Sequence, residues 1–546
     1  MADLHTPDIY DVLIVGAGPC GLAVASRLCE HSPSALFTDD EHQRYHWVKK
    51  HGRRMALKNR RNGRVSQKAM PHDKEPPKYS TLVLDGTGNE FMNRWKTLFT
   101  AFDIHHLRSP MFWHVDPSDR DALLAMAHNE GRENELFELK NCVGKEVSKH
   151  LRRSRAKCRN PLHHAVVDVD ERDRKDYFTP PTSLFLQHCH SIADRYGCGH
   201  VVRKEMVQHV DYPTAHISSP DEKLFTVRSD KGTHYARAVV LAVGPANKPV
   251  IPNIAGLSSL GPDKVSEPPH VCHAMKIKEF PATVVQDRIA ARKPTNVLVV
   301  GGGLTSAQLT DLAIRRGVTK VWHLMRGPCK VKLFDVDLSW MGKFRNVEQA
   351  YFWGADSDAE RLEHIRAARN GGSITPTYHK TLKHHVAAGR VELRCDTSIS
   401  GATFDAHRGT WSVETTPPVH AMPDFDYIYF ATGIETNFFD LPYLQDMLAK
   451  HPIEGHGGLP SINEDLKWAD DIPFFVTGRL AGLQLGPAGG NLGGARAGAE
   501  RIAWAIEDIL PGKSSQGGGE EFDDELHYVT ARGNRFRSLP VAGEDE

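Results

Sequence analysis

The sequence lacks several features that define large classes of proteins. Its nine cysteines include no CxxC pair, which argues against a disulfide-reductase dithiol, a zinc ribbon and a secreted disulfide framework. Lys plus Arg and Asp plus Glu both number 68, so no net field attracts nucleic acid or an anionic membrane. No apolar run approaches the roughly 18 residues that a membrane-spanning helix needs.

The amino-terminal stretch MADLHTPDIYD is acidic and lacks the basic and apolar parts of a secretory signal. The 31 histidines are dispersed, and their HH pairs do not have the spacing of metal ligands. These absences predict a protein of a reducing compartment, which we take to be the cytoplasm. They also predict no nucleic-acid partner, no membrane partner and no bound metal.

The length of 546 residues exceeds what one compact core holds and predicts two or three domains. Apolar strands alternate with amphipathic helices along most of the chain, which indicates an α/β fold. Residues from about 128 to 176 are highly charged with a weak apolar period, and we expect a surface insertion there. Residues 513–546 are rich in Gly, Ser and acidic residues, which predicts a disordered tail.

A dinucleotide-binding pattern occurs near the amino terminus in the stretch VLIVGAGPCGLA. Gly16, Gly18 and Gly21 form GxGxxG between an apolar strand and a helix. The first glycine permits a tight turn, the second lets the backbone approach a pyrophosphate, and the third lets helix and strand pack closely. An acid at the end of the next strand, Asp39 or Asp40 in FTDDE, is expected to accept the ribose hydroxyls. A purely structural turn is the alternative interpretation.

The same pattern recurs nearly three hundred residues later in VLVVGGGLTSAQL. Gly301, Gly303 and Ser306 form GxGxxS, and the strand after the helix ends in HLMRG with Arg326. A guanidinium at this position matches a 2′-phosphate better than a free ribose diol, so the turn predicts NADPH in preference to NADH. Two such turns in one chain allow a visiting nicotinamide to transfer hydride to a resident redox cofactor.

The stretches LAVG at 241–244 and FATGIETN at 430–437 resemble the ATG elements of flavoproteins with two dinucleotide folds. Together with the two glycine turns, their order resembles that of the class B flavin-dependent monooxygenases over residues 9–510. The resemblance implies two Rossmann-like domains, namely a three-layer ββα FAD domain with an inserted NADPH domain. It implies FAD and NADPH as cofactors and places Thr432 and Gly433 near them.

ATG elements mark where such a chain passes between the two domains. The resemblance therefore implies an FAD-binding domain formed by residues 1–254 and 422–512. Residues 255–421 are expected to form the NADPH-binding domain.

Four further segments are similar to the lysine and ornithine N-hydroxylases of siderophore synthesis. They are HLRSPMFWHVDPSDRDALLAM, FTPPTSLFLQHCHSIADRYG, VCHAMKIKEF and LAGLQLGPAGGNLGGARAGAERI. The first of these lies beside the flavin in that group, which makes Arg108 a candidate contact to flavin, nicotinamide or a substrate carboxylate. Arg108 stands where the ornithine enzymes have a lysine. The last segment caps the flavin, and Asn491 is expected to face the flavin pyrimidine edge.

The implied function is oxygenation of a small amine or amino acid by dioxygen through a C4a-hydroperoxyflavin, most simply an N-hydroxylation. A primary amine with a pKa near ~10.4 needs desolvation or a base to expose its lone pair. His114 and His273 are candidate bases, with Asp116 as a third. A homo-oligomer is compatible with the sequence. Alternatives are a flavin NADPH oxidoreductase and a non-catalytic FAD-binding regulator, since the chain also resembles oxidative-stress-induced growth inhibitor proteins.

Overall fold

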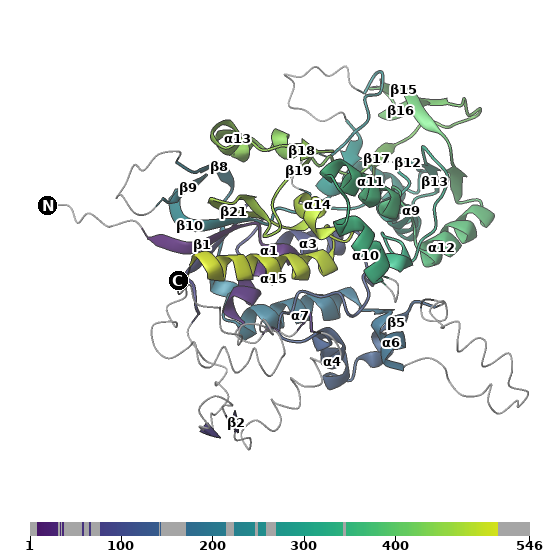
Figure 1. The fold of residues 1–546 in the computed structure, drawn as a ribbon. Helices are drawn as coiled ribbons and strands as arrows, with labels where there is room; N and C mark the ends of the chain where they lie inside the picture. Colours follow the sequence, from purple (N-terminus) through teal and green to yellow (C-terminus); the bar gives the residue numbers. More distant parts are fainter. Residues whose placement is uncertain are drawn as a thin grey trace, which may run out of the picture.

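The computed structural model describes most of the chain, with gaps. The described residues are 8–30, 33, 35–37, 57–58, 65–66, 77–140, 142, 171–213, 223–245, 249–257, 269–341 and 345–510. Asp39, Asp40, the expected tail and most of the expected insertion lie outside them. The described chain forms two sheets of mainly parallel strands with helices packed on them, which confirms the predicted α/β class (Figure 1).

The first sheet is built around the amino-terminal strand. Its strands follow the order β20 (Lys467–Ala469), β21 (Ile472–Val476), β10 (Thr233–Leu241), β1 (Ile9–Val15), β4 (Thr81–Asp85) and β7 (Val202–Lys204). β1 pairs in parallel with β10 and β4, and β10 pairs in parallel with β21. The carboxyl ends of these four strands therefore meet at one edge of the sheet. The antiparallel strands β8 (Val207–Asp211) and β9 (Phe225–Ser229) extend from β10.

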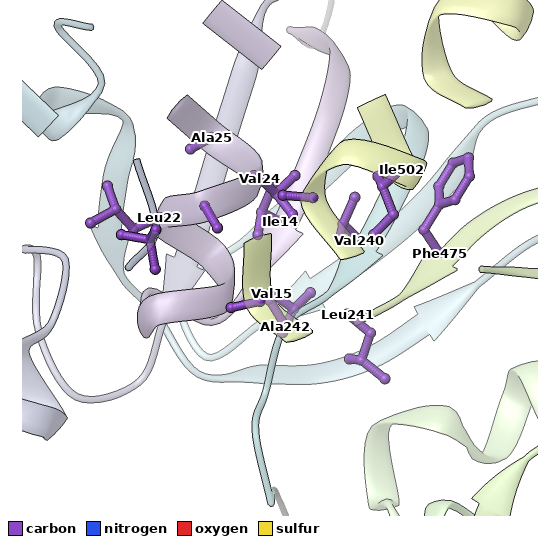
Figure 2. Close-up of a cluster of buried hydrophobic side chains, with 14 of the residues drawn as sticks. Ile14, Val15, Leu22, Val24, Ala25, Val240, Leu241, Ala242, Phe475 and Ile502 are labelled. Carbon is purple, nitrogen blue, oxygen red and sulfur yellow. The ribbon is translucent and has the colours of Figure 1, made fainter. Parts of the chain in front are cut away.

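Two helices that are far apart in sequence pack side by side on this sheet. They are α1 (Pro19–Cys29) and α15 (Leu492–Ile509), which lie next to each other in Figure 1. Figure 2 shows Val24 of α1 and Ile502 of α15 near Ile14 and Val240 of the central strands. These four side chains are fully buried. Strands buried on both faces need the continuous apolar runs seen in β1 and β10.

The second sheet is entirely parallel. Its order is β11 (Val271–His273), β17 (Tyr427–Phe430), β12 (Asn296–Val300), β13 (Lys320–Leu324) and β14 (Val391–Arg394). Helix α9 (Leu304–Arg315) connects β12 to β13, which is the predicted strand-turn-helix-strand unit. The other helices of this region are α8 (Thr283–Ala290), α10 (Arg345–Trp353), α11 (Asp358–Arg369) and α12 (Pro376–Ala387). The antiparallel pair β15 (Ser398–Asp405) and β16 (Thr410–Thr416) lies beside it.

The position of β17 corrects one expected domain boundary. This strand lies between β11 and β12 in the second sheet, whereas the sequence analysis assigned residues from 422 onward to the first domain. The motif after β17 marks the end of a strand but not the sheet to which that strand belongs. The chain crosses back only at 431–434, where Ile434 pairs with Pro249 of the outgoing segment. The two crossing segments thus lie against each other.

The remaining elements are short or surround the first sheet. They are β2 (Leu57–Lys58), β3 (Val65–Ser66), α3 (Asn93–Ala101), α4 (Ala122–Asn129), η2 (Glu133–Glu135), β5 (Phe137–Glu138), α6 (Glu171–Asp176), β6 (Phe178–Thr179), α7 (Thr182–Arg195), η5 (Gly199–Val201), η6 (Ala274–Lys276), η7 (Leu338–Trp340), η8 (Phe438–Asp440), η9 (Pro442–Leu444), α13 (Gln445–Lys450), β18 (Gly455–His456), β19 (Leu459–Pro460), η10 (Gly478–Ala481) and α14 (Gly482–Leu485). Strand β5 lies entirely within the expected insertion and pairs with β6. No helix within the described ranges is long and apolar enough to cross a membrane.

The two sheet regions are joined by packing as well as by the crossing segments. Phe102, at the end of α3, belongs to the apolar cluster formed by Val285 of α8 and Leu309 of α9. Beside it, Asp103 forms an ion pair with Arg315 at 2.5 Å. These contacts fix the orientation of the second sheet relative to the first.

The packing of α1 on α15 includes a buried ion pair whose loss we expect to be costly. Arg27 Nε and Nη2 donate to the two carboxylate oxygens of Glu500 at 2.6 and 3.2 Å, with both side chains about 95% buried. Glu500→Gln removes the charge that compensates a buried guanidinium, so the free energy of unfolding should fall by about 3 kcal/mol in denaturant titrations.

The control lies on the same helix. Glu507 pairs with Lys78 at 2.8 Å, but its side chain is 39% exposed. Glu507→Gln should therefore cost less than about 1 kcal/mol. Equal losses for the two variants would contradict the assignment of the Arg27–Glu500 pair as the electrostatic link between α1 and α15.

Candidate cofactor and substrate site

The first glycine turn has the geometry of a dinucleotide-binding turn. Gly16 has φ +107°, and a Cβ there would lie 2.5 Å from the carbonyl oxygen of Ala242 at the end of β10. A Cβ on Gly21 would lie 2.0 Å from the Gly16 oxygen. Both positions therefore exclude any side chain. Gly18 differs, because no heavy atom lies within 4 Å of where its Cβ would be.

The open space at Gly18 faces the amino end of α1. Gly18 caps this helix without a side chain, and Pro19 occupies the first turn. The first N–H groups of a helix have no partner inside the helix and carry a partial positive charge. The turn therefore offers backbone donors to an anion such as a pyrophosphate.

The structure identifies an acidic residue at this turn that the sequence analysis missed. Strand β4, adjacent to β1, ends in Asp85, whose Oδ2 accepts the N–H of Ala17 at 2.8 Å. Its Oδ1 accepts the backbone N–H of Thr87 at 2.7 Å. A dinucleotide fold has its ribose-binding acid at the end of the strand next to the glycine turn. The usual spacing predicts Asp39 or Asp40 for this role, and because both lie outside the described residues that expectation stays a prediction. The stretch TLVLDG, an apolar strand that ends in an acid, adds Asp85 as a further candidate.

The second glycine turn repeats the geometry of the first at the other sheet. Gly301 has φ +153°, and a Cβ there would lie 2.4 Å from the carbonyl oxygen of Ala431 after β17. Gly303 caps α9 without a side-chain hydrogen bond. Ser306 is buried, and its hydroxyl donates to the Gly303 oxygen at 2.7 Å. Ser306 therefore fills the third-glycine position as a packing residue, and its hydroxyl is already satisfied within the helix.

A buried histidine of β13 hydrogen-bonds to the backbone of the second glycine turn. His323 of β13 has its Nε2 2.9 Å from the Gly301 oxygen and its Nδ1 3.2 Å from Thr310 Oγ1. Burial lowers the pKa of His323 to about 4, so its ring is neutral at pH 7. The carbonyl contact assigns the proton to Nε2. His323 was not identified from the sequence, because a lone histidine in a strand gives no such signal.

Arg326 follows β13 at the same edge and is exposed. It has no hydrogen-bond or ion-pair partner within the part of the chain that the structure describes. The two lysines nearby are engaged, since Lys330 Nζ donates to the carbonyl and side chain of Asn370 at 2.9 and 2.8 Å. Lys332 Nζ lies 3.0 Å from the carboxylate of Asp337. Of these three cations, Arg326 is the one available to a 2′-phosphate.

Two linked loops of the second region lie near the glycine turn, and one of them contacts it directly. Residues 330–334 and 370–374 are linked by backbone hydrogen bonds, including Ile374 N–H to the Lys330 oxygen at 2.9 Å. A Cβ on Gly372 would lie 3.2 Å from the Cα of Gly303. We call these two loops the paired loops. Through Gly372 they border the amino end of α9.

Arg108 reaches the paired loops from the first-sheet region. Its Nε donates to the Leu333 oxygen at 3.1 Å, and its Nη2 donates to the oxygens of Lys332 and Phe334 at 3.0 and 2.6 Å. Nη2 also donates to Ser373 Oγ at 2.9 Å. Although burial lowers the pKa of Arg108 to about 10, the group stays protonated at pH 7. Most of its donors hold the backbone of the paired loops, so Arg108 acts here as a positioning residue. The expected contact to flavin, nicotinamide or a substrate carboxylate stays a prediction.

The geometry also corrects the expectation for His114. Its Nε2 lies 2.7 Å from the Arg120 oxygen, and its Nδ1 accepts the N–H of Asp116 at 3.2 Å. The ring is fully buried, and burial holds the pKa of His114 well below its usual range. Asp116 is occupied in turn by Arg195 and Ser118. With both ring nitrogens engaged, His114 holds its loop in place and has no free nitrogen for a substrate proton.

His273 lies where the two crossing segments meet. It ends β11, and its Nδ1 accepts the N–H of Met275 at 3.2 Å. Its Nε2 is buried beside the backbone of Gly433, without a well-formed hydrogen bond to any described residue. Thr432 on the same segment donates its hydroxyl to the Val250 oxygen. Of the two candidate histidines, His273 is the one that lies at the junction of the sheets.

Asn491 caps α15 at the carboxyl edge of the first sheet. Its Oδ1 accepts the N–H groups of Gly493 and Gly494 at 3.1 and 3.4 Å. Its Nδ2 is buried and has no hydrogen-bond partner among the described residues. A Cβ on Gly493 would lie 2.9 Å from the ring of Trp113, which covers this helix end. An unused amide donor at this place fits a ligand that carries carbonyl groups.

Comparisons with known proteins identify the same architecture in flavin enzymes. No protein-family model matches the chain, and no curated protein shows a significant match. One similar structure is the ornithine N-hydroxylase of Kutzneria sp. 744, solved with reduced FAD, NADP⁺ and L-ornithine. It superposes with a TM-score of 0.58 at 16% sequence identity, and the match covers 92% of this chain and 100% of that enzyme. The ornithine hydroxylase of Pseudomonas aeruginosa gives 0.57 at 16% identity with the same coverage.

A third similar structure is the FAD-bound cadaverine monooxygenase of Erwinia amylovora. It superposes with a TM-score of 0.56 at 14% identity, covering 91% of this chain and 94% of its own. Such low identities establish a shared fold. The predicted resemblance to two-domain N-hydroxylases is therefore confirmed at the level of fold.

If the second turn binds NADPH, as its sequence predicts, the contacts of Arg108 should affect the use of that cofactor. Arg108→Met removes the donors that hold the paired loops against the second glycine turn. We expect the KM for NADPH to rise about tenfold, while the bound FAD content, read from the flavin absorbance, stays unchanged.

Arg132 provides the matched control, since it is an arginine of the first region that bonds only to surface groups such as Glu135 and Gln187. Arg132→Met should leave the KM for NADPH within about twofold. A loss of FAD from the Arg108 variant, or an unchanged KM, would contradict the positioning role.

Proposed function

We propose that the protein is an FAD- and NADPH-dependent monooxygenase that N-hydroxylates a small amine or amino acid with dioxygen. The observation that carries the proposal is the pair of glycine turns, one at the carboxyl edge of the parallel strands of each sheet, each followed by a helix whose amino end has no side-chain cap. Both turns abut the end of a strand that leads into a crossing segment. The named activities of the structurally similar enzymes, which act on ornithine and cadaverine, support the same reaction.

The first turn fits FAD. Gly18 and the amino end of α1 provide donors and space for the pyrophosphate, and Asp85 is placed to accept the ribose hydroxyls. The unused Nδ2 of Asn491 is available to the flavin carbonyl groups at the same sheet edge. When bound, FAD supplies the ring that takes up hydride and activates dioxygen, chemistry that amino-acid side chains do not provide.

The second turn fits NADPH. Gly303 and the amino end of α9 bind the pyrophosphate, while Arg326 binds the 2′-phosphate in a charge-assisted contact. The neutral His323 keeps the Gly301 carbonyl in place and so fixes the turn. Arg108 holds the paired loops beside the cofactor. These residues would orient the nicotinamide so that its hydride can pass to the ring held at the first site.

The role of the chain toward the substrate is mainly exclusion of water. A primary amine is protonated at pH 7 and needs to lose this proton before it can act as a nucleophile. Burial lowers the pKa of His273, so this residue is a weak proton acceptor. Desolvation of the ammonium group favours the neutral amine independently of any base. We therefore assign His273 a supporting role and desolvation the larger effect.

The proposal includes a reducing compartment that supplies NADPH, which we take to be the cytoplasm. The eight cysteines within the described residues are all free thiols. Free thiols persist where glutathione and thioredoxin keep cysteines reduced.

The proposed reaction is tested by product balance in the FAD-loaded protein. NADPH oxidation, hydroxylamine and hydrogen peroxide are measured together across a panel of primary amines and basic amino acids. At least one substrate should accelerate NADPH oxidation and give hydroxylamine in near-equal amount. Peroxide formation equal to NADPH oxidation with every substrate would indicate an oxidase, and a flavin that NADPH does not reduce would indicate a binding protein.

The preference for NADPH should depend on Arg326. Arg326→Ala removes the one unengaged cation at the 2′-phosphate position, so the KM for NADPH should rise about 100-fold. The KM for NADH should change less than about twofold. Lys320→Ala, at the opposite end of β13, is the control and should leave both values unchanged. Similar increases for the two nucleotides in the Arg326 variant would refute the phosphate assignment.

A further inference from the structure

An arginine without a described partner follows the strand β21 of the first sheet. β21 runs parallel to β10 and ends at Val476, and Arg479 follows in η10 at the same sheet edge as the first glycine turn. The residue is exposed, and its side chain forms no hydrogen bond or ion pair with any residue that the structure describes. Arg479 is thus an unengaged cation at the edge where the proposal places FAD.

The backbone before Arg479 lies next to the first glycine turn. Gly478 has φ +72°, and a Cβ there would lie 3.0 Å from Sγ of Cys20, which belongs to the first turn of α1. Thr477 donates its N–H to the Leu241 oxygen at 3.0 Å, so the chain leaves β21 beside the end of β10. These contacts place Arg479 close to the amino end of α1.

The side chain of Arg479 packs along the loop that leads into α15. A Cβ on Gly490 would lie 3.5 Å from the Cβ of Arg479 and 3.7 Å from its Cγ. Gly490 directly precedes Asn491, whose buried Nδ2 has no partner among the described residues. The stem of Arg479 therefore contacts the residue beside the one that we assign to the flavin carbonyl groups.

A second arginine near Arg479 is already paired. Arg369, the last residue of α11, pairs with Asp335 at 3.1 Å and donates to the Pro487 oxygen at 3.0 Å. Helix α11 packs on α14, which follows η10 directly (Figure 1). Partial burial lowers the pKa of Arg479, and the charge of Arg369 lowers it further. Because Asp335 balances Arg369, the charge of Arg479 remains uncompensated.

Reduction of the flavin creates an anion at this edge. Transfer of a hydride from NADPH leaves NADP⁺ and a reduced flavin with one negative charge, unless the reduced ring takes up a proton from the solvent. This charge is delocalised over N1 and the C2 carbonyl group of the pyrimidine ring. A charge near these atoms is one of the ways in which a protein tunes its flavin. A fixed cation there stabilises the anionic reduced form more than the neutral oxidised form.

We infer that Arg479 faces the pyrimidine edge of the bound flavin and stabilises the negative charge of its reduced form, which raises the reduction potential of the flavin. The inference rests on the proposed binding of FAD at the first turn. The pyrophosphate has the backbone donors at the amino end of α1. The ring edge, in contrast, has only the neutral amide of Asn491 in the proposed assignment, which leaves its charge in the reduced state to Arg479.

The test measures the midpoint potential of the FAD-loaded protein against a reference dye, without NADPH, substrate or oxygen. Arg479→Met keeps most of the side-chain length and removes the charge. The equilibrium constant for two-electron reduction should fall about 100-fold, which corresponds to a potential lower by about 60 mV. Arg479→Lys keeps a cation at this edge and should retain most of the potential. An unchanged potential in the Arg479→Met protein would overturn the inference.

The protonation of the reduced flavin provides an independent readout. The reduced protein is titrated with acid under anaerobic conditions, and the absorbance spectrum distinguishes the anionic from the neutral reduced flavin. Loss of the cation in Arg479→Met should raise the pKa of the reduced flavin by about two units. A lower potential without a change in this pKa would overturn the inference, because Arg479 would then not act on the negative charge.

Arg501 on α15 is the matched control. It stacks on Trp353 and donates to the Gln484 oxygen at 3.3 Å. Arg501→Met should leave both the potential and the pKa of the reduced flavin unchanged. The dissociation constant of FAD is measured for the same variants. If Arg479→Met weakens FAD binding while the flavin that stays bound keeps its potential, the guanidinium binds the pyrophosphate and the inference is overturned.

The potential also separates this inference from the proposed reaction. If NADPH does not reduce the flavin, or if no amine is hydroxylated, the proposed function fails, but a potential that depends on Arg479 still supports the inference. If hydroxylamine forms and the potential does not depend on Arg479, the reaction stands and the inference is overturned.

Discussion

The structure depends on a close backbone contact that occurs twice. Gly16 lies against the carbonyl of Ala242, and Gly301 lies against the carbonyl of Ala431, so that a Cβ at either glycine would overlap an oxygen at about 2.5 Å. Both carbonyls follow strands that lead into the segments joining the two sheets. Each glycine turn is therefore fixed to the adjacent strand end, and the two turns are connected through the crossing segments, where Pro249 pairs with Ile434.

Side chains of the first-sheet region that contact the second-sheet region fix the orientation of one region relative to the other. Phe102 enters the apolar cluster under α9, and Arg108 holds the carbonyls of the paired loops. Arg108 thus contributes to the geometry of the second glycine turn through its contacts with the paired loops.

Local sequence patterns predicted the strands, helices and glycine turns. Which sheet a strand joins, and which partners a side chain contacts, depends on residues far apart in the sequence. Both glycine turns, the strands before them and the helices after them followed from apolar runs and glycine spacing. The placement of Asp85 beside the first turn did not follow from the usual spacing, which assumes that the second strand follows the first helix closely, whereas β4 begins at Thr81. The sheet membership of β17 and the partners of Arg108, more than two hundred residues away, depend on tertiary structure.

The central claim is that a flavin in the first site is reduced by a nicotinamide in the second. Anaerobic mixing of the FAD-loaded protein with one equivalent of NADPH measures this step alone, without substrate or oxygen. The account predicts full loss of the oxidised-flavin absorbance and faster reduction by NADPH than by NADH. Protein that takes up no FAD, or bound FAD that stays oxidised, would contradict it.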